Sequence, residues 1–191
     1  MTVSEFMSKI EIKSNFAGLT LADDFVLAIN LSGHTESSDP GTYTVVEAGL
    51  KSADGQLNPE EKTNSYIRKG KSTTKTGVQR SFSLDMDRYI GDEAQDFFDS
   101  YAVKYGTGQA CVVDYVFFNM LTGKGEKGMM SVIVNTDCSG GSEENSGLSV
   151  DLKSTGVKPE KYTWTAVSSP SDSGTGTNEQ NTDNTNTESG S

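Results

Sequence analysis

Five basic side chains, with no acid among them, fall in one short stretch of this sequence, SYIRKGKSTTKTGVQR, residues 65–80. They are Arg68, Lys69, Lys71, Lys75 and Arg80. They stand out because the chain of 191 residues has a formal net charge of -11. Clustered lysines and arginines neutralise phosphates, so contact with nucleic acid is one interpretation. Docking on another protein chain and a simply solvated loop are the other two.

Aromatic residues, which nucleic-acid binders use to stack on bases, are sparse beside this basic stretch. Only Tyr66 and Phe82 lie close to it in the sequence. Proteins that grip single strands interleave such rings with cations, and this platform is missing. The composition therefore weakens the nucleic-acid interpretation.

Residue types that could do catalysis or bind metals are equally sparse. The single histidine, His34, lies in the turn-forming stretch LSGHTESSDPG, which predicts a solvated side chain and removes the usual base of nucleophilic triads and most zinc sites. Phosphate-loop, dinucleotide-binding, metalloprotease and calcium-loop motifs are missing. We expect no catalytic residue, no metal ligand and no cofactor, and predict that the chain is not an enzyme.

The two cysteines and the hydropathy of the chain bear on its compartment. Cys111 and Cys138 lie in strand-like segments without CxxC spacing, which favours free thiols in a reducing compartment and leaves a disulfide between them open. The longest apolar run, Phe25 to Ile29, is far shorter than the ~18 residues of a membrane span, and no export signal is recognisable. We expect a soluble protein that does not contact membranes.

Short segments rich in Val, Thr, Ile, Tyr and Phe alternate with turn residues, which predicts a mainly β fold, an antiparallel β-sandwich or barrel. Along residues 78–88 apolar side chains alternate with polar Gln79, Ser81 and Ser83, so one strand face should be core. Arg80 falls on the apolar face and should be paired or near the rim. A hairpin turn is expected at 124–127. The expected strands cover residues 24–31, 42–51, 63–68, 78–88, 109–121, 129–138, 148–154 and 161–167.

One segment, GDEAQDFFDSYAVKYG, departs from the β pattern. Apolar residues recur at helical spacing from Ala94 to Tyr105, which predicts one α-helix over about 92–105, packed on the sheet, with Asp92 and Gln95 as a capping box. Residues 109–121 are apolar on both faces. With a single helix to cover them, a subunit interface becomes a serious alternative.

The last residues, 168–191, contain four acids, no bases and no aliphatic or aromatic side chain. Such a segment buries too little surface to offset its ordering entropy, so we predict a disordered, polar, acidic tail. Residues 1–167 are expected to form one folded domain, and their net charge is -7 once the four acids of the tail are set aside.

The run EEKTNSYIRKGKSTTKTGVQRSFSLDMDRYIGDEAQDFFDSY, residues 60–101, resembles the central segment of the major tail (tail tube) proteins of long-tailed bacteriophages. The matching features are the threonine-rich basic loop, the QRSFSL strand and the DRYIGDEAQDFF approach to the helix. The resemblance is expected to cover residues 1–167. It implies a virion structural protein, made in the host bacterial cytoplasm, whose hexameric rings stack into a tail tube for DNA passage during genome ejection.

The resemblance also implies partners and assembly elements. The partners are other copies of the chain, the tape measure, tail tip and terminator proteins, and double-stranded DNA as transiting cargo. The candidate assembly elements are the N-terminal arm, residues 1–15, and a long loop region, residues 51–77.

A tube through which DNA slides needs non-adhesive walls, because every neutralised phosphate strengthens the grip and steepens its salt dependence. The basic residues should therefore face away from the channel, toward carboxylates of a neighbouring subunit. The expected interface residues are Arg68, Lys69, Lys71, Lys75, Arg80, Asp85, Asp87, Asp92 and Asp96, and the candidate lumen face is Gln79, Ser81 and Ser83.

Two further function classes stay open beside the tail tube. One is a carbohydrate- or nucleic-acid-binding β-module. The other is the tube protein of a contractile bacteriocin or secretion device, which shares the architecture and differs in its cargo.

Overall fold

A computed structural model describes residues 1–35 and 38–165 of the chain, so the predicted tail at 168–191 lies outside the described residues. The strands are β1 Phe25–Ile29, β2 Thr44–Val45, β3 Leu50–Gln56, β4 Pro59–Tyr66, β5 Gly70–Val78, β6 Ser81–Asp87, β7 Val112–Asn119, β8 Lys124–Thr136, β9 Gly147–Ser154 and β10 Glu160–Thr163. The α-helices are α1 Val3–Met7, α2 Glu93–Asp99 and α3 Tyr101–Lys104. Single 3-10 turns are η1 Ala22–Asp24, η2 Pro40–Thr42 and η3 Gly108–Cys111.

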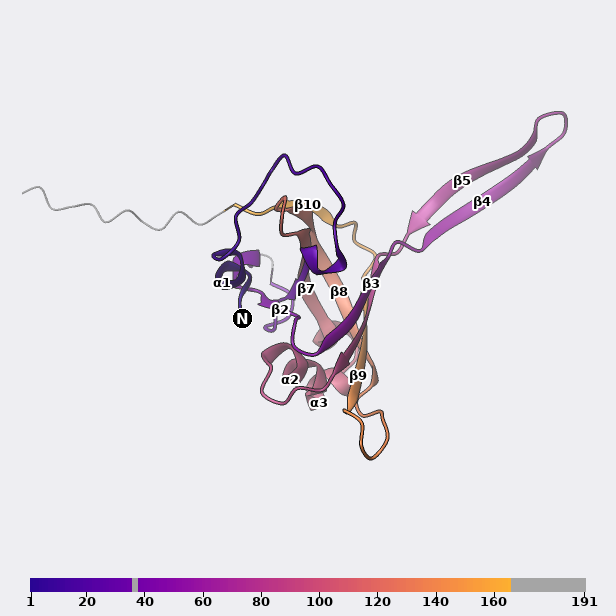
Figure 1. The fold of residues 1–191 in the computed structure, drawn as a ribbon. Coiled ribbons are helices and arrows are strands. Elements are labelled where there is room, and N and C mark those ends of the chain that lie inside the picture. Colours follow the sequence, from indigo (N-terminus) through magenta and orange to yellow (C-terminus); the bar gives the residue numbers. More distant parts are fainter. Residues whose placement is uncertain (36–37, 166–191) are drawn as a thin grey trace, which may run out of the picture.

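Eight strands form one antiparallel sheet in the order β2-β1-β7-β8-β9-β6-β3, with β10 added beside β8. The sheet curls into a half-barrel, with α2 and α3 at one end and α1 against one side (Figure 1). The remaining two strands, β4 and β5, pair only with each other. The predicted mainly β, antiparallel fold is confirmed.

Strand β6 shows the alternation that its sequence predicts. Phe82, Leu84 and Met86 are buried in the main core, whereas Ser83 and Asp85 are exposed. The period-two pattern was enough to place this strand because one of its faces is solvated.

Strand β7 is apolar on both faces because the chain covers both of them. Its Val116 and Phe118 pack in a second core with α1, whose Val3 and Met7 are buried, while alternate residues face the main core. The N-terminal arm thus begins as a helix on its own domain. Of the two alternatives for residues 109–121, cover within the domain and cover by a neighbouring subunit, the described chain supplies the first.

The predicted single helix over about 92–105 is broken at Ser100. Asp92 caps α2 as predicted, but Ser100 adopts an extended conformation and its hydroxyl accepts a hydrogen bond from the Val103 N–H to start α3. The break shifts the helical register, so Val103 is buried whereas Tyr101 and Tyr105 are exposed. The predicted apolar stripe is wrong beyond the break.

The predicted turn at 124–127 is also misplaced, because those residues begin β8. The connection from β7 is residues 120–123 instead, where the Asn119 side chain accepts hydrogen bonds from the N–H groups of Leu121 and Thr122. An asparagine that folds back on the next backbone amides is a strong turn former. The turn signal of Asn119 thus lies just before the predicted residues 124–127.

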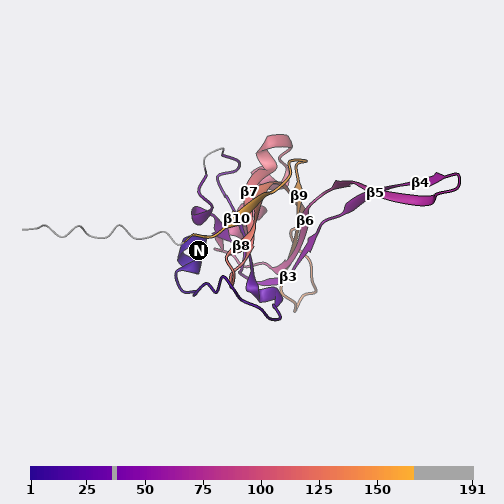
Figure 2. The ribbon, with the colours of Figure 1, turned by 90° about the horizontal axis from the view of Figure 1, so that it is seen from above.

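Residues 51–77, expected as a long loop region, are largely β-structure. After β3, the strands β4 and β5 form a hairpin that projects away from the half-barrel in both views (Figures 1 and 2). Its turn uses positive φ angles at Arg68 and Gly70. Hydrophobic alternation could not reveal these strands, because the hairpin is polar on both faces, with Thr63 and Thr73 bonded across it at 3.0 Å. We call residues 59–78 the arm and the rest of the described chain the body.

Helix α2 is tied to the sheet by the side chain of Gln95, which is only 1% exposed. Its Oε1 accepts a hydrogen bond from the Tyr89 N–H at 2.6 Å, and its Nε2 donates to the Ala48 carbonyl at 2.6 Å and to the Asp87 carbonyl at 3.0 Å. The prediction that Gln95 completes a capping box with Asp92 is therefore wrong, because its side chain bonds to these other backbone groups. The side chain satisfies three backbone groups on the segments flanking β3 and β6.

Replacing Gln95 should therefore lower stability through backbone groups left unpaired. For Gln95→Ala we expect the free energy of unfolding to fall by roughly 2–4 kcal/mol, because each unpaired buried polar group costs ~1–3 kcal/mol. Gln95→Glu keeps the size but aims an anion at two carbonyl oxygens, so it should lose as much at neutral pH and recover in part when acid protonates it. Urea unfolding followed by circular dichroism measures both.

The exposed Gln79 is the matched control for this pair of variants. Gln79→Ala should change the free energy of unfolding by no more than about 0.5 kcal/mol, as surface substitutions usually do. Equal stability of the Gln79 and Gln95 variants would contradict the role assigned to Gln95.

Candidate functional site: a basic arm on an acidic body

Four of the five predicted cations lie together on the arm. Arg68 and Lys69 are in its turn, Lys71 and Lys75 are on β5, and all four are exposed. Within the described part of the chain none of them forms an ion pair. Their charge is therefore available to another molecule.

Charge is segregated between the arm and the body. The arm contains five bases and two acids, a net charge of +3, so the rest of residues 1–167 has a net charge of -10. The arm projects away from its own body (Figure 1). The net charges of the arm and of the rest of residues 1–167 are therefore opposite in sign.

The tip of the arm is apolar as well as basic, which was not predicted from the sequence. Ile67 is 94% exposed and Tyr66 is 52% exposed, next to Arg68 and Lys69. Hairpin turns usually carry Gly, Asn or Asp, because these residues tolerate the turn conformation and water. An exposed isoleucine at a projecting turn does not stabilise the isolated chain.

Arg80, the fifth predicted cation, lies at the base of the arm and is only 10% exposed. Its Nε donates to Glu126 Oε1 at 2.6 Å, and its guanidinium lies 4.2 Å from the centroid of the Phe82 ring and 5.1 Å from that of Phe117. The prediction that it would be paired is confirmed. Its place in an exposed interface is not, since the pair anchors the arm to β8 instead.

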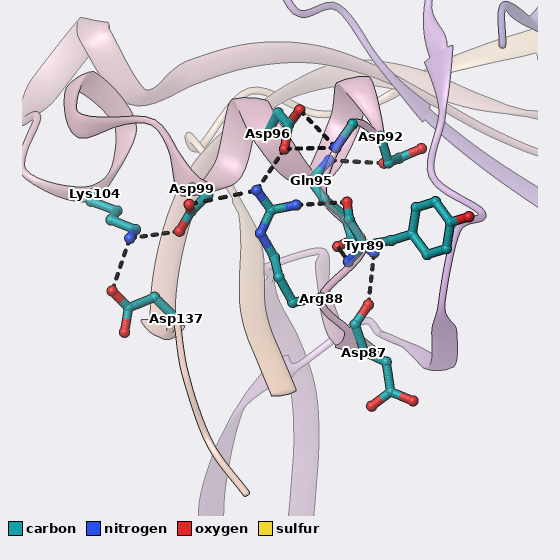
Figure 3. Close-up of polar contacts among 10 residues, drawn as sticks. Asp87, Arg88, Tyr89, Asp92, Gln95, Asp96, Asp99, Lys104 and Asp137 are labelled. Carbon is teal, nitrogen blue, oxygen red and sulfur yellow. Dashed lines mark hydrogen bonds and ion pairs between the residues drawn. The ribbon is translucent and has the colours of Figure 1, made fainter. Parts of the chain in front are cut away.

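The predicted acidic docking partners are mostly committed within their own chain. Asp87 Oδ1 lies 2.6 Å from Lys51 Nζ, and the Asp92 carboxylate accepts the Gln95 N–H at the start of α2. Asp96 accepts a hydrogen bond from Arg88 at 2.5 Å (Figure 3).

Two neighbours extend the network around Arg88. Asp99 lies between Arg88 and Lys104, and Lys104 also reaches Asp137 at 2.8 Å (Figure 3). Of the four aspartates predicted to dock with the cations, only Asp85 is exposed and lacks an ion pair in the described ranges.

The candidate lumen face is divided by the structure. Gln79 is exposed, and Ser83 is exposed while donating to Asp151 at 2.7 Å. Ser81 is 7% exposed and accepts a hydrogen bond from Asn58 at 2.8 Å, so it cannot present its side chain to a channel.

A second polar cluster surrounds Asp114 on β7. His34 is exposed, as predicted, and its Nδ1 also lies 2.6 Å from Asp114 Oδ1, a contact that the sequence analysis did not predict. Asp114 Oδ2 accepts hydrogen bonds from the Thr35 N–H at 2.9 Å and the Ser38 hydroxyl at 3.0 Å. Serine, histidine and aspartate meet here, but Ser38 donates to the carboxylate and not to the imidazole. Among the described residues the Ser38 hydroxyl has no hydrogen bond to the imidazole, so the order of contacts differs from that of a Ser-His-Asp triad.

The hydrogen bonds of this cluster favour the ionised form of Asp114. Burial raises the pKa of the carboxyl, but the hydrogen bonds from His34, Thr35 and Ser38 outweigh it, so the pKa of Asp114 lies below its ordinary value. The cluster holds the segment between β1 and β2 on the sheet.

Other candidate chemistry is limited in the described residues. Among residues 1–35 and 38–165, no three His, Cys, Asp or Glu side chains are grouped to hold a metal ion, and no helix is long and apolar enough to span a membrane. Cys111 is buried, Cys138 is exposed, and both are free.

Comparisons with known proteins show the fold. No family model and no curated protein matches the chain. A chain in the tail of an empty GTA particle, computed with helical refinement and C6 symmetry, matches with a TM-score of 0.51 and 18% identity, over 76% of this chain and 100% of that chain. The chain thus shares its β-fold with a subunit of a six-fold helical tail.

The Asp114 cluster makes a pH-dependent contribution to stability. Because the folded pKa lies below the ordinary 3.8, the contribution is complete above that value and is lost as the pH falls toward the folded pKa. We expect Asp114→Asn to lower the free energy of unfolding by about 1.5–3 kcal/mol at neutral pH, the range for hydrogen bonds to charged groups. The difference from the unmodified chain should shrink as the pH falls below 3.8.

Thermal unfolding of both chains across the acid range measures this difference. The exposed Asp85 provides the control, since Asp85→Asn removes a carboxylate without an ion pair and should track the unmodified chain at every pH. A deficit of Asp114→Asn that does not change with pH would contradict the assignment.

Proposed function

We propose that this chain is the tail tube subunit of a phage-like particle, a virion structural protein that self-assembles into stacked rings of six. The observation that carries the proposal is the fold shared with a chain of a helical tail with C6 symmetry, which is matched over its full length. The residues that resemble tail tube proteins, 60–101, include the whole basic part of the arm. The other partners would be tape measure, tail tip and terminator proteins.

The arm is suited to join copies of the chain. It projects from the body, carries unpaired cations, and complements the rest of residues 1–167, whose net charge is -10. Individual exposed ion pairs contribute only ~0–1 kcal/mol, so the charges would set orientation and register more than affinity. In a ring of six, the small free energies of these ion pairs would add together over all the subunit contacts.

The acidic body is suited to line a channel for DNA. A wall of net negative charge repels phosphates and lets a duplex slide, whereas cations at the wall would hold it. In this proposal the exposed cations of the arm lie between subunits, away from the lumen. Gln79 and Ser83 remain the proposed lumen residues, without Ser81.

Electron microscopy of the purified full-length chain tests the proposed function. At high concentration, or with a tail tip complex as initiator, we expect rings or tubes of uniform diameter whose class averages show six-fold symmetry. A chain that stays monomeric in both conditions would contradict the proposal.

Charge reversal on the arm tests its part in assembly. We expect Lys69, Lys71 and Lys75, changed together to Glu, to prevent ring and tube formation while the thermal unfolding temperature stays close to that of the unmodified chain. The reason is that all three side chains are exposed and none of them forms an ion pair within residues 1–35 and 38–165. Sedimentation and electron microscopy give the readout.

Three exposed lysines on the body form the matched control for this triple reversal. Lys124, Lys158 and Lys161, changed together to Glu, alter the net charge equally and should leave assembly intact. Normal tubes from the arm variant would leave the arm as a solvated hairpin.

A further inference from the structure

A cleft of about 340 Å³ opens on the body between β1, β2 and β3. Its walls include Phe25, Leu50 and Phe117, with the Phe25 and Phe117 rings stacked at 5.4 Å. Phe25 is 41% exposed although it begins a core strand. The cleft is therefore an apolar hollow that the rest of the described chain does not fill.

The cleft exists because the sheet is left open at this place. Residues 25–29 of β1 pair with β7 on one side; on the other, β2 pairs with Ala28 and Ile29, and the Val46 N–H donates to the Leu27 carbonyl, so the edge is open at Phe25 and Val26. Strand β3 pairs with β6 alone. Two partly unpaired strand edges thus border the hollow, which is the kind of site where natural proteins accept another chain.

The charge at the cleft is negative. Asp23 and Glu47 are among its lining residues, and neither forms an ion pair in the ranges that the structure describes. The one lining cation, Lys51, is held by Asp87 at 2.6 Å. An apolar group followed by free cations would match both the walls and the rim.

We propose that this cleft receives the tip of the arm from a second copy of the chain. In this contact Tyr66 and Ile67 enter the apolar hollow, and Arg68 and Lys69 lie beside the acidic rim. The proposal rests on the self-assembly put forward above and names the surface that the arm binds. It accounts for two features that are unexplained in the isolated chain, the bare isoleucine of the tip and the exposed ring of Phe25.

The contact must join different copies. The arm leads away from its own body in both views, so its tip cannot fold back into the cleft of the same chain (Figures 1 and 2). Each copy has one tip and one cleft on different parts of its surface. Such a head-to-tail contact does not stop at a dimer, and it propagates through rings or stacks.

A competing receptor is the exposed pair Tyr101 and Tyr105, whose ring centroids are 4.8 Å apart on α3. Exposed aromatic rings attract cations. However, this pair sits beside Lys104 on a short helix and offers no apolar hollow for Ile67. It serves as the comparison site in the test.

Cysteine cross-linking within assembled protein tests the docking. In a Cys138→Ser background, Ile67→Cys is combined with Ala22→Cys, at the lining of the cleft, and separately with Ala102→Cys, an exposed alanine on α3 beside the tyrosine pair. After mild oxidation, a non-reducing denaturing gel should show a ladder of dimers, trimers and longer species for the cleft pair. The α3 pair and the single Ile67→Cys variant should give dimers at most.

Three results would overturn the docking, and they separate it from the proposed function. Normal tubes by electron microscopy with no ladder from the cleft pair would reject the cleft but keep the tail tube. A ladder from the α3 pair instead would move the contact to the tyrosines. A chain that stays monomeric would reject both proposals, because no second copy would be present to dock.

Discussion

The burial of β7 on both faces is the constraint on which the rest of the structure depends. A strand without a solvated face needs hydrogen-bonded strands at both edges and side chains over both surfaces. The chain meets this need with β1 and β8 at the edges, α1 on one surface, and the curled sheet with α2 on the other. None of the helices in residues 1–35 and 38–165 closes the sheet between β1 and β3, so the cleft follows from how β7 is covered.

Local patterns predicted the parts of the fold whose causes are local. The alternation of β6 and the aspartate that caps α2 were readable because each depends on neighbours within a few residues. The break at Ser100 could not be predicted in this way. A continuous helix and an interrupted one have the same local pattern here, and only tertiary packing determines that Val103 is buried and Tyr101 is exposed. The strands of the arm were hidden for a different reason, since they are almost entirely exposed and carry no apolar period.

The candidate site was predicted in composition but not in geometry. The cations of the arm were conspicuous in an acidic chain, whereas the use of Asp87, Asp92 and Asp96 within their own chain depends on folding. The bond between His34 and Asp114 spans 80 positions, and no local rule connects two such residues. The surfaces left for a partner are those without such internal contacts, namely the cations of the arm and the apolar cleft of the body.

The pairing of β4 with β5 makes the length of the arm independent of the body. The two strands meet each other from Pro59 opposite Val78 out to Tyr66 opposite Gly70, and no other strand depends on their register. Each residue added to both strands would extend the reach by about 3.3 Å, and additions in twos would keep every side chain on its present face. The distance that the arm spans could thus differ among related chains while the half-barrel stays the same.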